Sequence, residues 1–181
     1  MERIETQFFV LFSDEQSPYF QVDPALRVAF PFHQLKGKTC FQRAFTEFLF
    51  GGDSQIDLTF LKSYATGTSK HFHSFEKQSL HQTIRIQNWR EDVVLKQDDI
   101  VRLSYVTIQD LAVRDVLAYT KSIVRGKKSS FIAFYNARYL LTVDDDECVV
   151  ISKTREDMNA VQNFIQETEE ERSTWRKSIL A

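Results

Sequence analysis

Hydrophobic positions recur with helical spacing in three segments of the chain. Each segment opens on a threonine that is followed, three residues later, by an acidic or amide side chain, and this pairing is typical of a helix N-terminus. The pairs are Thr39 with Gln42, Thr107 with Asp110, and Thr154 with Asp157. The pattern therefore predicts helices that begin at these three places.

The apolar positions of each segment fall on one face of its predicted helix. They are Phe41, Ala44, Phe45, Phe48 and Leu49 in the first; Ile108, Leu111, Ala112, Val116, Tyr119 and Ile123 in the second; and Met158, Val161, Phe164 and Ile165 in the third. Gly51 and Gly126 follow the first two at the positions where a left-handed residue ends a helix. Ile4, Phe8, Leu11 and Phe12 also have helical spacing, which favours a short helix, although the run from Phe8 to Phe12 fits a buried strand equally well.

Elsewhere the apolar residues alternate with polar ones or form short runs, which predicts about six strands. The candidate segments are 26–32, 56–60, 83–87, 101–105, 131–135, 139–143 and 148–151. Asn136-Ala137 and the acidic stretch Asp144 to Glu147 lie between the last three and are typical of tight turns. Residues 131–151 should therefore form a three-stranded antiparallel meander.

Helices and strands do not alternate regularly along the chain, so the predicted class is α+β, with a mixed, mainly antiparallel sheet and three to four helices. The C-terminal part should be the meander followed by a helix. The 181 residues are interpreted as one domain, with a polar, linker-like stretch near residues 65–82 where two lobes could meet.

Composition excludes several classes of protein. The net charge of −2 and the charged fraction of 27% give no overall field to attract nucleic acid or an anionic membrane. No apolar stretch reaches the ~18 to 20 residues of a membrane span, and residues 1–5 do not resemble the start of a signal peptide. The expected location is the cytoplasm. Cys40 and Cys148, far apart in sequence, are interpreted as small buried residues.

Two groups of side chains are candidate metal ligands. Asp144, Asp145 and Asp146 form a dense acidic cluster, and carboxylates of this kind can hold a divalent cation for phosphodiester chemistry. His71 and His73 could present two imidazoles on one side of an extended segment. A solvated turn and exposed histidines explain the same residues more simply, so no metal or cofactor is predicted, and a metal-dependent phosphodiesterase or nuclease stays the alternative.

Motifs for binding anions are incomplete. Gly37-Lys38-Thr39 precedes a predicted helix, but a phosphate-binding loop needs a glycine where this chain has Phe32. Lys121, Arg125, Lys127 and Lys128 precede an aromatic strand, an arrangement that can bind single-stranded nucleic acid but also fits a helix C-terminus. A nucleotide-binding module therefore remains a second alternative, and nucleic acid is not the expected partner.

Residues suited to protein recognition are easier to find. Trp89 and Trp175 each lie among polar neighbours and beside an arginine, and both residue types are enriched at binding hot spots. The lid of a hydrophobic core explains each tryptophan at least as well as an anchor does. Glu167, Glu169 and Glu170 make the last predicted helix acidic. No pattern for nucleophilic catalysis is present. The expected partner is therefore another protein.

The early strand Leu26-Arg27-Val28, the phenylalanine-rich helix after it, and the Asp-Asp turn before Val149 and Ile151 occur in an order that is similar to a bacterial family. The chain resembles a domain of unknown function common in Bacillus-type bacteria and their phages. It departs from that family at Ala29, Val143, Asp146 and Glu147, and no functional residue is transferred. The resemblance implies a small α+β protein that acts by binding another protein, as immunity proteins and phage regulators do.

Overall fold

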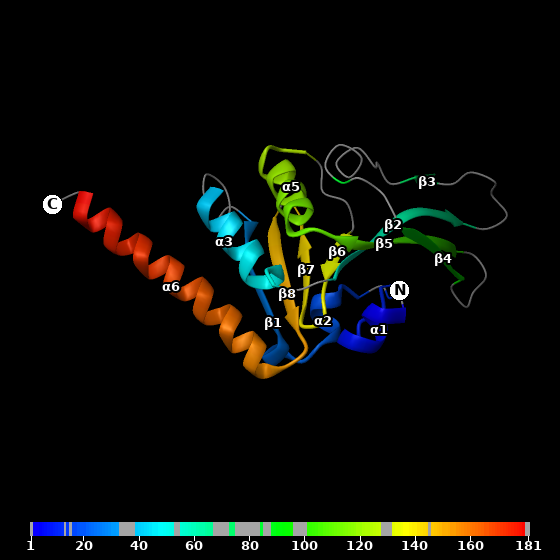
Figure 1. Ribbon diagram of the computed structural model, residues 1–181. Helices are drawn as coiled ribbons and strands as arrows, with labels where there is room; N and C mark the ends of the chain where they lie inside the picture. Colours follow the sequence, from blue (N-terminus) through cyan, green and yellow to red (C-terminus); the bar gives the residue numbers. More distant parts are fainter. Residues whose placement is uncertain are drawn as a thin grey trace.

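A computed structural model describes residues 2–12, 14, 16–32, 39–52, 55–66, 73–74, 84, 88–95, 101–127, 132–144 and 146–179 of the chain. These residues form an α+β fold built on one antiparallel sheet (Figure 1). The predicted class is therefore confirmed.

The sheet has the strand order β1-β8-β7-β6-β2-β5-β4, and β3 pairs with β2 beside this path. The strands are β1 (Arg27–Pro31), β2 (Ile56–Thr66), β3 (His73–Ser74), β4 (Trp89–Leu95), β5 (Val101–Leu111), β6 (Ile132–Tyr135), β7 (Tyr139–Val143) and β8 (Glu147–Ser152). Pairing along β2 and β5 is the most extensive, from Ile56 opposite Leu111 to Thr66 opposite Val101. β1 and β4 lie at the two ends of the strand order.

Helices cover the two faces of the sheet unequally. α3 (Thr39–Phe50), α5 (Val113–Val124) and the start of α6 (Arg155–Ile179) lie on one face, and the N-terminal segment with α1 (Glu2–Phe8) and α2 (Pro18–Gln21) lies on the other. A 3₁₀ turn, η1 (Pro24–Leu26), leads into β1. Figure 1 shows the C-terminal end of α6 pointing away from the sheet.

The alternation of side chains along each strand divides the core into two clusters. Ile132 and Phe134 of β6 pack among residues of α3, α5 and α6, whereas Ala133 and Tyr135 pack among residues of the N-terminal segment. The same period of two runs through β7 and β8. The sheet is therefore buried on both faces at its centre, which explains why these strands read as nearly continuous apolar runs.

The predicted meander is confirmed. β6, β7 and β8 pair in succession and antiparallel. Asn136 forms the first turn, where its side chain accepts hydrogen bonds from the backbone N–H groups of Arg138 and Tyr139, and Asp144 accepts from those of Asp146 and Glu147 in the second.

The predicted start of the second helix is wrong. Residues Thr107 to Asp110 continue β5, and α5 begins after Ala112, whose backbone N–H donates to the Asp115 carboxylate at 2.9 Å. The side chains of Thr107 and Ile108 point to opposite faces of the sheet, so strand pairing across β2 outweighs the local capping pattern. Only the residues from Val116 onward make the predicted helical stripe.

Of the remaining predictions, some are confirmed and others are wrong. α3 and the start of α6 are confirmed, including the Thr154 hydroxyl, which accepts from the Asp157 N–H at 3.1 Å. The left-handed residue after α3 is Gly52, at φ 87°, rather than Gly51. Ala44 and Cys40 are exposed, contrary to prediction, since both lie on the outer face of α3. The predicted strand 83–87 falls, except for Ile84, outside the described residues, as does most of the linker-like stretch.

Candidate functional site

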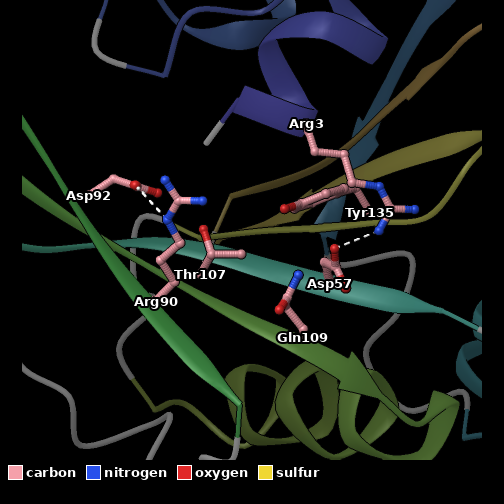
Figure 2. A pocket seen from close by; sticks show the side chains of 7 residues that line it. All are labelled: Arg3, Asp57, Arg90, Asp92, Thr107, Gln109 and Tyr135. Atoms are coloured by element: carbon pink, nitrogen blue, oxygen red, sulfur yellow. Dashed lines mark hydrogen bonds and ion pairs between the residues drawn. The ribbon is translucent and has the colours of Figure 1, made fainter.

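A polar pocket of about 140 Å³ lies on the face of the sheet that carries α1. Figure 2 shows the side chains that line it, which come from α1, β2, β4, β5 and β6. They are Arg3, Asp57, Arg90, Asp92, Thr107, Gln109 and Tyr135. Residues from five elements thus meet at one place, although they are widely spaced in sequence.

One ion pair of the pocket joins Arg3 to Asp57. The Arg3 guanidinium donates to the Asp57 carboxylate at 2.6 Å, and the Asp57 side chain is only 1% exposed. The same guanidinium lies 5.8 Å from the centre of the Tyr135 ring. Because a buried carboxylate is costly unless it is paired, Arg3 both neutralises Asp57 and fastens α1 to the sheet.

The backbone beside Asp57 is irregular. The pairing of β2 with β5 shifts register between Ile56 and Leu58, and Asp110, opposite this point, has a positive φ of 58°. The Asp110 N–H donates to the other Asp57 oxygen at 3.4 Å. A bulge of this kind bends a strand and re-aims its side chains, and bulges are over-represented next to functional sites.

The hydroxyl groups of two lining residues, Thr107 and Tyr135, are connected through that of the buried Thr59. The Thr59 hydroxyl lies 3.0 Å from that of Thr107 and 3.4 Å from that of Tyr135. Burial raises the pKa of Tyr135 to about 12, against the opposing effect of its hydrogen bond to Thr59. The phenol is therefore protonated at neutral pH and serves as a hydrogen-bonding group rather than as a base.

β4 supplies the second ion pair of the pocket. Arg90 and Asp92 are two residues apart on this strand, so both side chains point to the α1 face, where the Arg90 Nε lies 3.1 Å from an Asp92 oxygen. The Arg90 side chain is 72% exposed. Figure 2 shows the two ion pairs apart from each other across the pocket, one with the buried Asp57 and the other with the largely exposed Arg90.

The opposite face of β4 carries apolar side chains. Trp89, Val93 and Leu95 are 57%, 45% and 66% exposed. They lie opposite Ile108, Ser104 and Arg102 of β5, so they share one face of the sheet. Between them, Glu91 pairs with Lys62 of β2 at 2.7 Å. We call Trp89, Val93 and Leu95 the β4 stripe.

Comparison of the chain with protein families, with curated proteins and with solved structures finds no match. The resemblance to a bacterial and phage domain accordingly stays a prediction.

The predicted metal ligands are only partly described. Within the described residues, no group of three or more His, Cys, Asp and Glu side chains is placed to hold a metal ion. Asp144 and Asp146 are exposed, and Asp144 uses one oxygen to accept the backbone hydrogen bonds of its turn. Asp145 and His71 lie outside the described residues, and only the backbone of His73, in β3, is described.

The predicted interaction residues lie on two elements. Trp89 is at the start of β4, whereas Glu167, Glu169, Glu170 and Trp175 lie on α6. Glu167 is exposed, and for the other three only the helical backbone is described. None of the helices in the described part of the chain is both long and apolar enough to cross a membrane.

Sequence reasoning missed the pocket altogether. Its members are single charged or polar residues at alternate strand positions, and no local spacing connects them. The signal that could have found it is the presence of polar residues inside otherwise apolar strands: Asp57 and Thr59 interrupt the run from Ile56 to Phe60. A polar residue in a buried strand indicates a specific partner.

Proposed function

We propose that this protein acts without chemistry of its own, by binding another protein along β4. The observation that carries the proposal is the β4 stripe. Its three apolar side chains are each at least 45% exposed, and they lie on one face of a strand at the end of the sheet. Lone exposed apolar residues are common on proteins, but here three share one face of an edge strand, with the Glu91–Lys62 ion pair between Trp89 and Val93.

Natural proteins protect the outer strands of their sheets against pairing with other chains. β1, at the other end of the sheet, follows this rule because it has five residues and ends on Pro31. β4 is longer, with seven residues, and its exposed apolar side chains lie at the first, fifth and seventh positions. The contrast between the two edges favours β4 as the place where a partner adds.

The partner chemistry that fits is an extended segment with apolar side chains at alternate positions. Such a segment would add a strand beside β4 through backbone hydrogen bonds and place its apolar side chains against the stripe. Trp89 supplies the largest contact area and is the expected hot spot. A bacterial or phage protein with an immunity-like or regulatory role, which the resemblance implies, would act in this way.

Affinity capture from the native host tests the proposal. Tagged protein is compared with the double variant Trp89→Ser/Val93→Lys, which removes the anchor and places a lysine on the strand. The control is Phe20→Ser, which removes another exposed aromatic, 61% exposed, on α2. All three proteins are first shown to have similar thermal midpoints.

We expect one protein in fixed stoichiometry with the wild type and with Phe20→Ser, and its loss with the β4 variant. Retention of the partner by the β4 variant would exclude the β4 stripe as its binding site. Charge reversal at Glu167, Glu169 and Glu170 is measured in parallel, since acidic residues at the rim of an interface act mainly on the association rate. If these reversals alone abolish capture, the interface is on α6.

A further inference from the structure

β4 is the last strand of the described sheet (Figure 1), and only half of its backbone groups point to β5. The Gln109 N–H donates to the Asn88 carbonyl at 3.1 Å, and these two residues lie directly opposite each other, next to Trp89. Opposite residues that exchange such bonds recur at every second position of an antiparallel pair. The even-numbered residues of β4 therefore bond to β5, whereas Trp89, Glu91 and Val93 direct their N–H and C=O groups to the outer edge.

A second copy of the chain fits this edge as an antiparallel strand, about a twofold axis that passes beside Glu91. Each Glu91 then lies opposite its counterpart, and Trp89 lies opposite Val93 of the second copy. All three residues direct their backbone groups outwards, so each opposite pair can exchange two N–H···O=C hydrogen bonds. Because such an axis is perpendicular to the sheet, the β4 stripe of one copy continues onto that of the other.

The same register makes the charges on the other face of β4 complementary. Arg90 lies opposite Asp92 of the second copy, and Asp92 lies opposite its Arg90. Within each chain these two groups already pair at 3.1 Å, so the four charges form a square in which every neighbour has the opposite sign. Neither group has to leave its present partners, because a guanidinium has several N–H donors and a carboxylate has several acceptor sites.

The neighbouring registers lack this complementarity. An axis beside Asp92 would place the two Asp92 side chains directly opposite each other, and an axis beside Arg90 would do the same to the two arginines, which is destabilising in both cases. The register centred on Glu91 also brings two like charges together. Lys62 of β2, however, donates to each Glu91 carboxylate at 2.7 Å, which neutralises it and holds it towards β2, away from the edge.

We propose that a second copy of this chain pairs antiparallel with β4 in this register, so that the protein covers the β4 stripe with itself when no other partner is bound. The inference rests on the proposed function, because it assigns an occupant to the same edge. Twofold dimers need such a self-complementary patch. The contact is confined to residues 89–93 of each copy, well below the size of a standard interface, so the dimer should dissociate in dilute solution and leave the edge open.

Sedimentation velocity of the purified full chain, from micromolar to submillimolar concentration, tests the dimer. Two variants reverse one charge each, Arg90→Asp and Asp92→Arg, and a third variant carries both changes. Arg43→Asp reverses an exposed arginine on α3 and serves as the matched control. The two single variants are also mixed in equal amounts, because one then presents two carboxylates to the two guanidinium groups of the other.

We expect the wild type and Arg43→Asp to change from monomer to dimer as concentration rises. Each single reversal at Arg90 or Asp92 should weaken self-association at least about tenfold, because like charges then lie opposite each other. The mixture of the two single variants should form a one-to-one dimer, and the double variant should dimerise with itself. Recovery in the mixture also shows that each single variant is folded.

A wild-type chain that stays monomeric at every concentration would overturn the inference. Single reversals that dimerise as well as the wild type, or a mixture that stays monomeric, would overturn it too. The proposed function fails separately. A monomer that captures a protein partner through Trp89 and Val93 would support that function and contradict the dimer, whereas a dimer that the mixture restores, without any captured protein, would do the reverse.

Discussion

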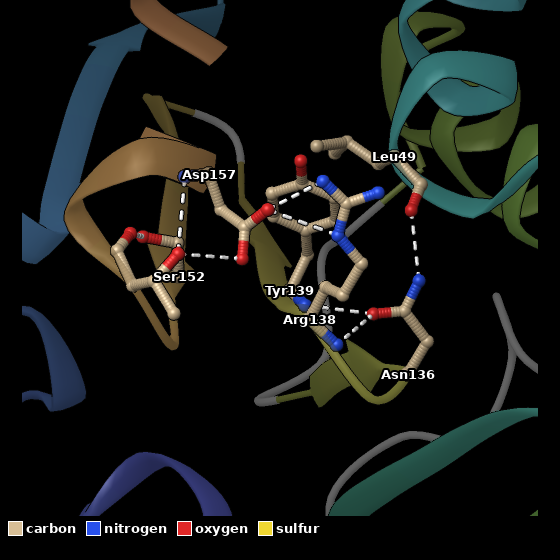
Figure 3. Close-up of polar contacts among 7 residues, drawn as sticks. Leu49, Asn136, Arg138, Tyr139, Ser152 and Asp157 are labelled. Atoms are coloured by element: carbon tan, nitrogen blue, oxygen red, sulfur yellow. Dashed lines mark hydrogen bonds and ion pairs between the residues drawn. The ribbon is translucent and has the colours of Figure 1, made fainter. Parts of the chain in front are cut away.

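A single asparagine holds three parts of the fold together. Asn136 is fully buried in the turn between β6 and β7, where it donates to the Leu49 carbonyl at the end of α3 at 2.8 Å (Figure 3). The side-chain oxygen of Asn136 accepts from the backbone N–H groups of Arg138 and Tyr139 at 2.9 and 2.7 Å. Arg138 in turn pairs with Asp157 at the start of α6. The turn therefore fixes α3 and α6 against the meander.

Asn136→Ala should lower the free energy of unfolding by about 2–4 kcal/mol, because it leaves several buried backbone groups without partners. Asp144→Ala, which removes the matching side chain from the exposed second turn, should cost only about 1 kcal/mol, since water can replace its hydrogen bonds. Urea unfolding of both variants measures the difference. Equal losses would show that the Asn136 side chain does not connect the elements as described.

Individual residues also show where prediction from sequence stops. The two turns were predictable from their residue types, but the burial of one and the exposure of the other were not. Cys148 and Cys40 illustrate the same limit: burial, with smaller contributions from Asp144 and Glu147, raises the pKa of the Cys148 thiol, whereas Cys40 is exposed on α3. Burial depends on the packing of distant elements, and a single residue type carries little information about it.

At the scale of elements, local patterns predicted the helices well except where a strand is followed directly by a helix. The pair Thr107 and Asp110 matches a helix start, yet these residues extend β5 because β2 lies alongside them. The helix begins after Ala112, where Asp115 completes the cap. Long-range pairing decided between two local signals of similar strength.

Two substitutions distinguish these alternative helix starts. Asp115→Ala should destabilise the protein by about 1 kcal/mol, because the backbone N–H of Ala112 loses its acceptor. Asp110→Gly should have little effect or be stabilising, since Asp110 already has a positive φ that glycine adopts without strain. Thermal unfolding of both variants measures this. A larger loss for Asp110→Gly than for Asp115→Ala would favour the start predicted from sequence.

The strand β4 was not predicted, for a reason connected with its position. A central strand is buried on both faces and reads as a run of apolar residues, whereas a strand at the end of a sheet has no such constraint. The central charges Arg90, Glu91 and Asp92 obscure the alternation of Trp89, Val93 and Leu95. Trp89 and Arg90 are neighbours in sequence, but in the strand their side chains point to opposite faces of the sheet.

At the scale of the molecule, the α+β class and the meander followed from hydrophobic periodicity because both depend on contacts between neighbours in sequence. The polar pocket depends on five elements meeting, and the β4 stripe depends on which strand ends the sheet. Neither is encoded in local spacing. The two features lie on opposite faces of β4.

Hydrogen–deuterium exchange of the protein, free and with its captured partner, tests the central claim most directly. We predict slower exchange of the amides in residues 89–95 of the complex, with the β1 edge unchanged, because an added strand would accept hydrogen bonds from β4. Protection confined to α6 or to the N-terminal segment, with unaltered exchange along β4, would contradict the account.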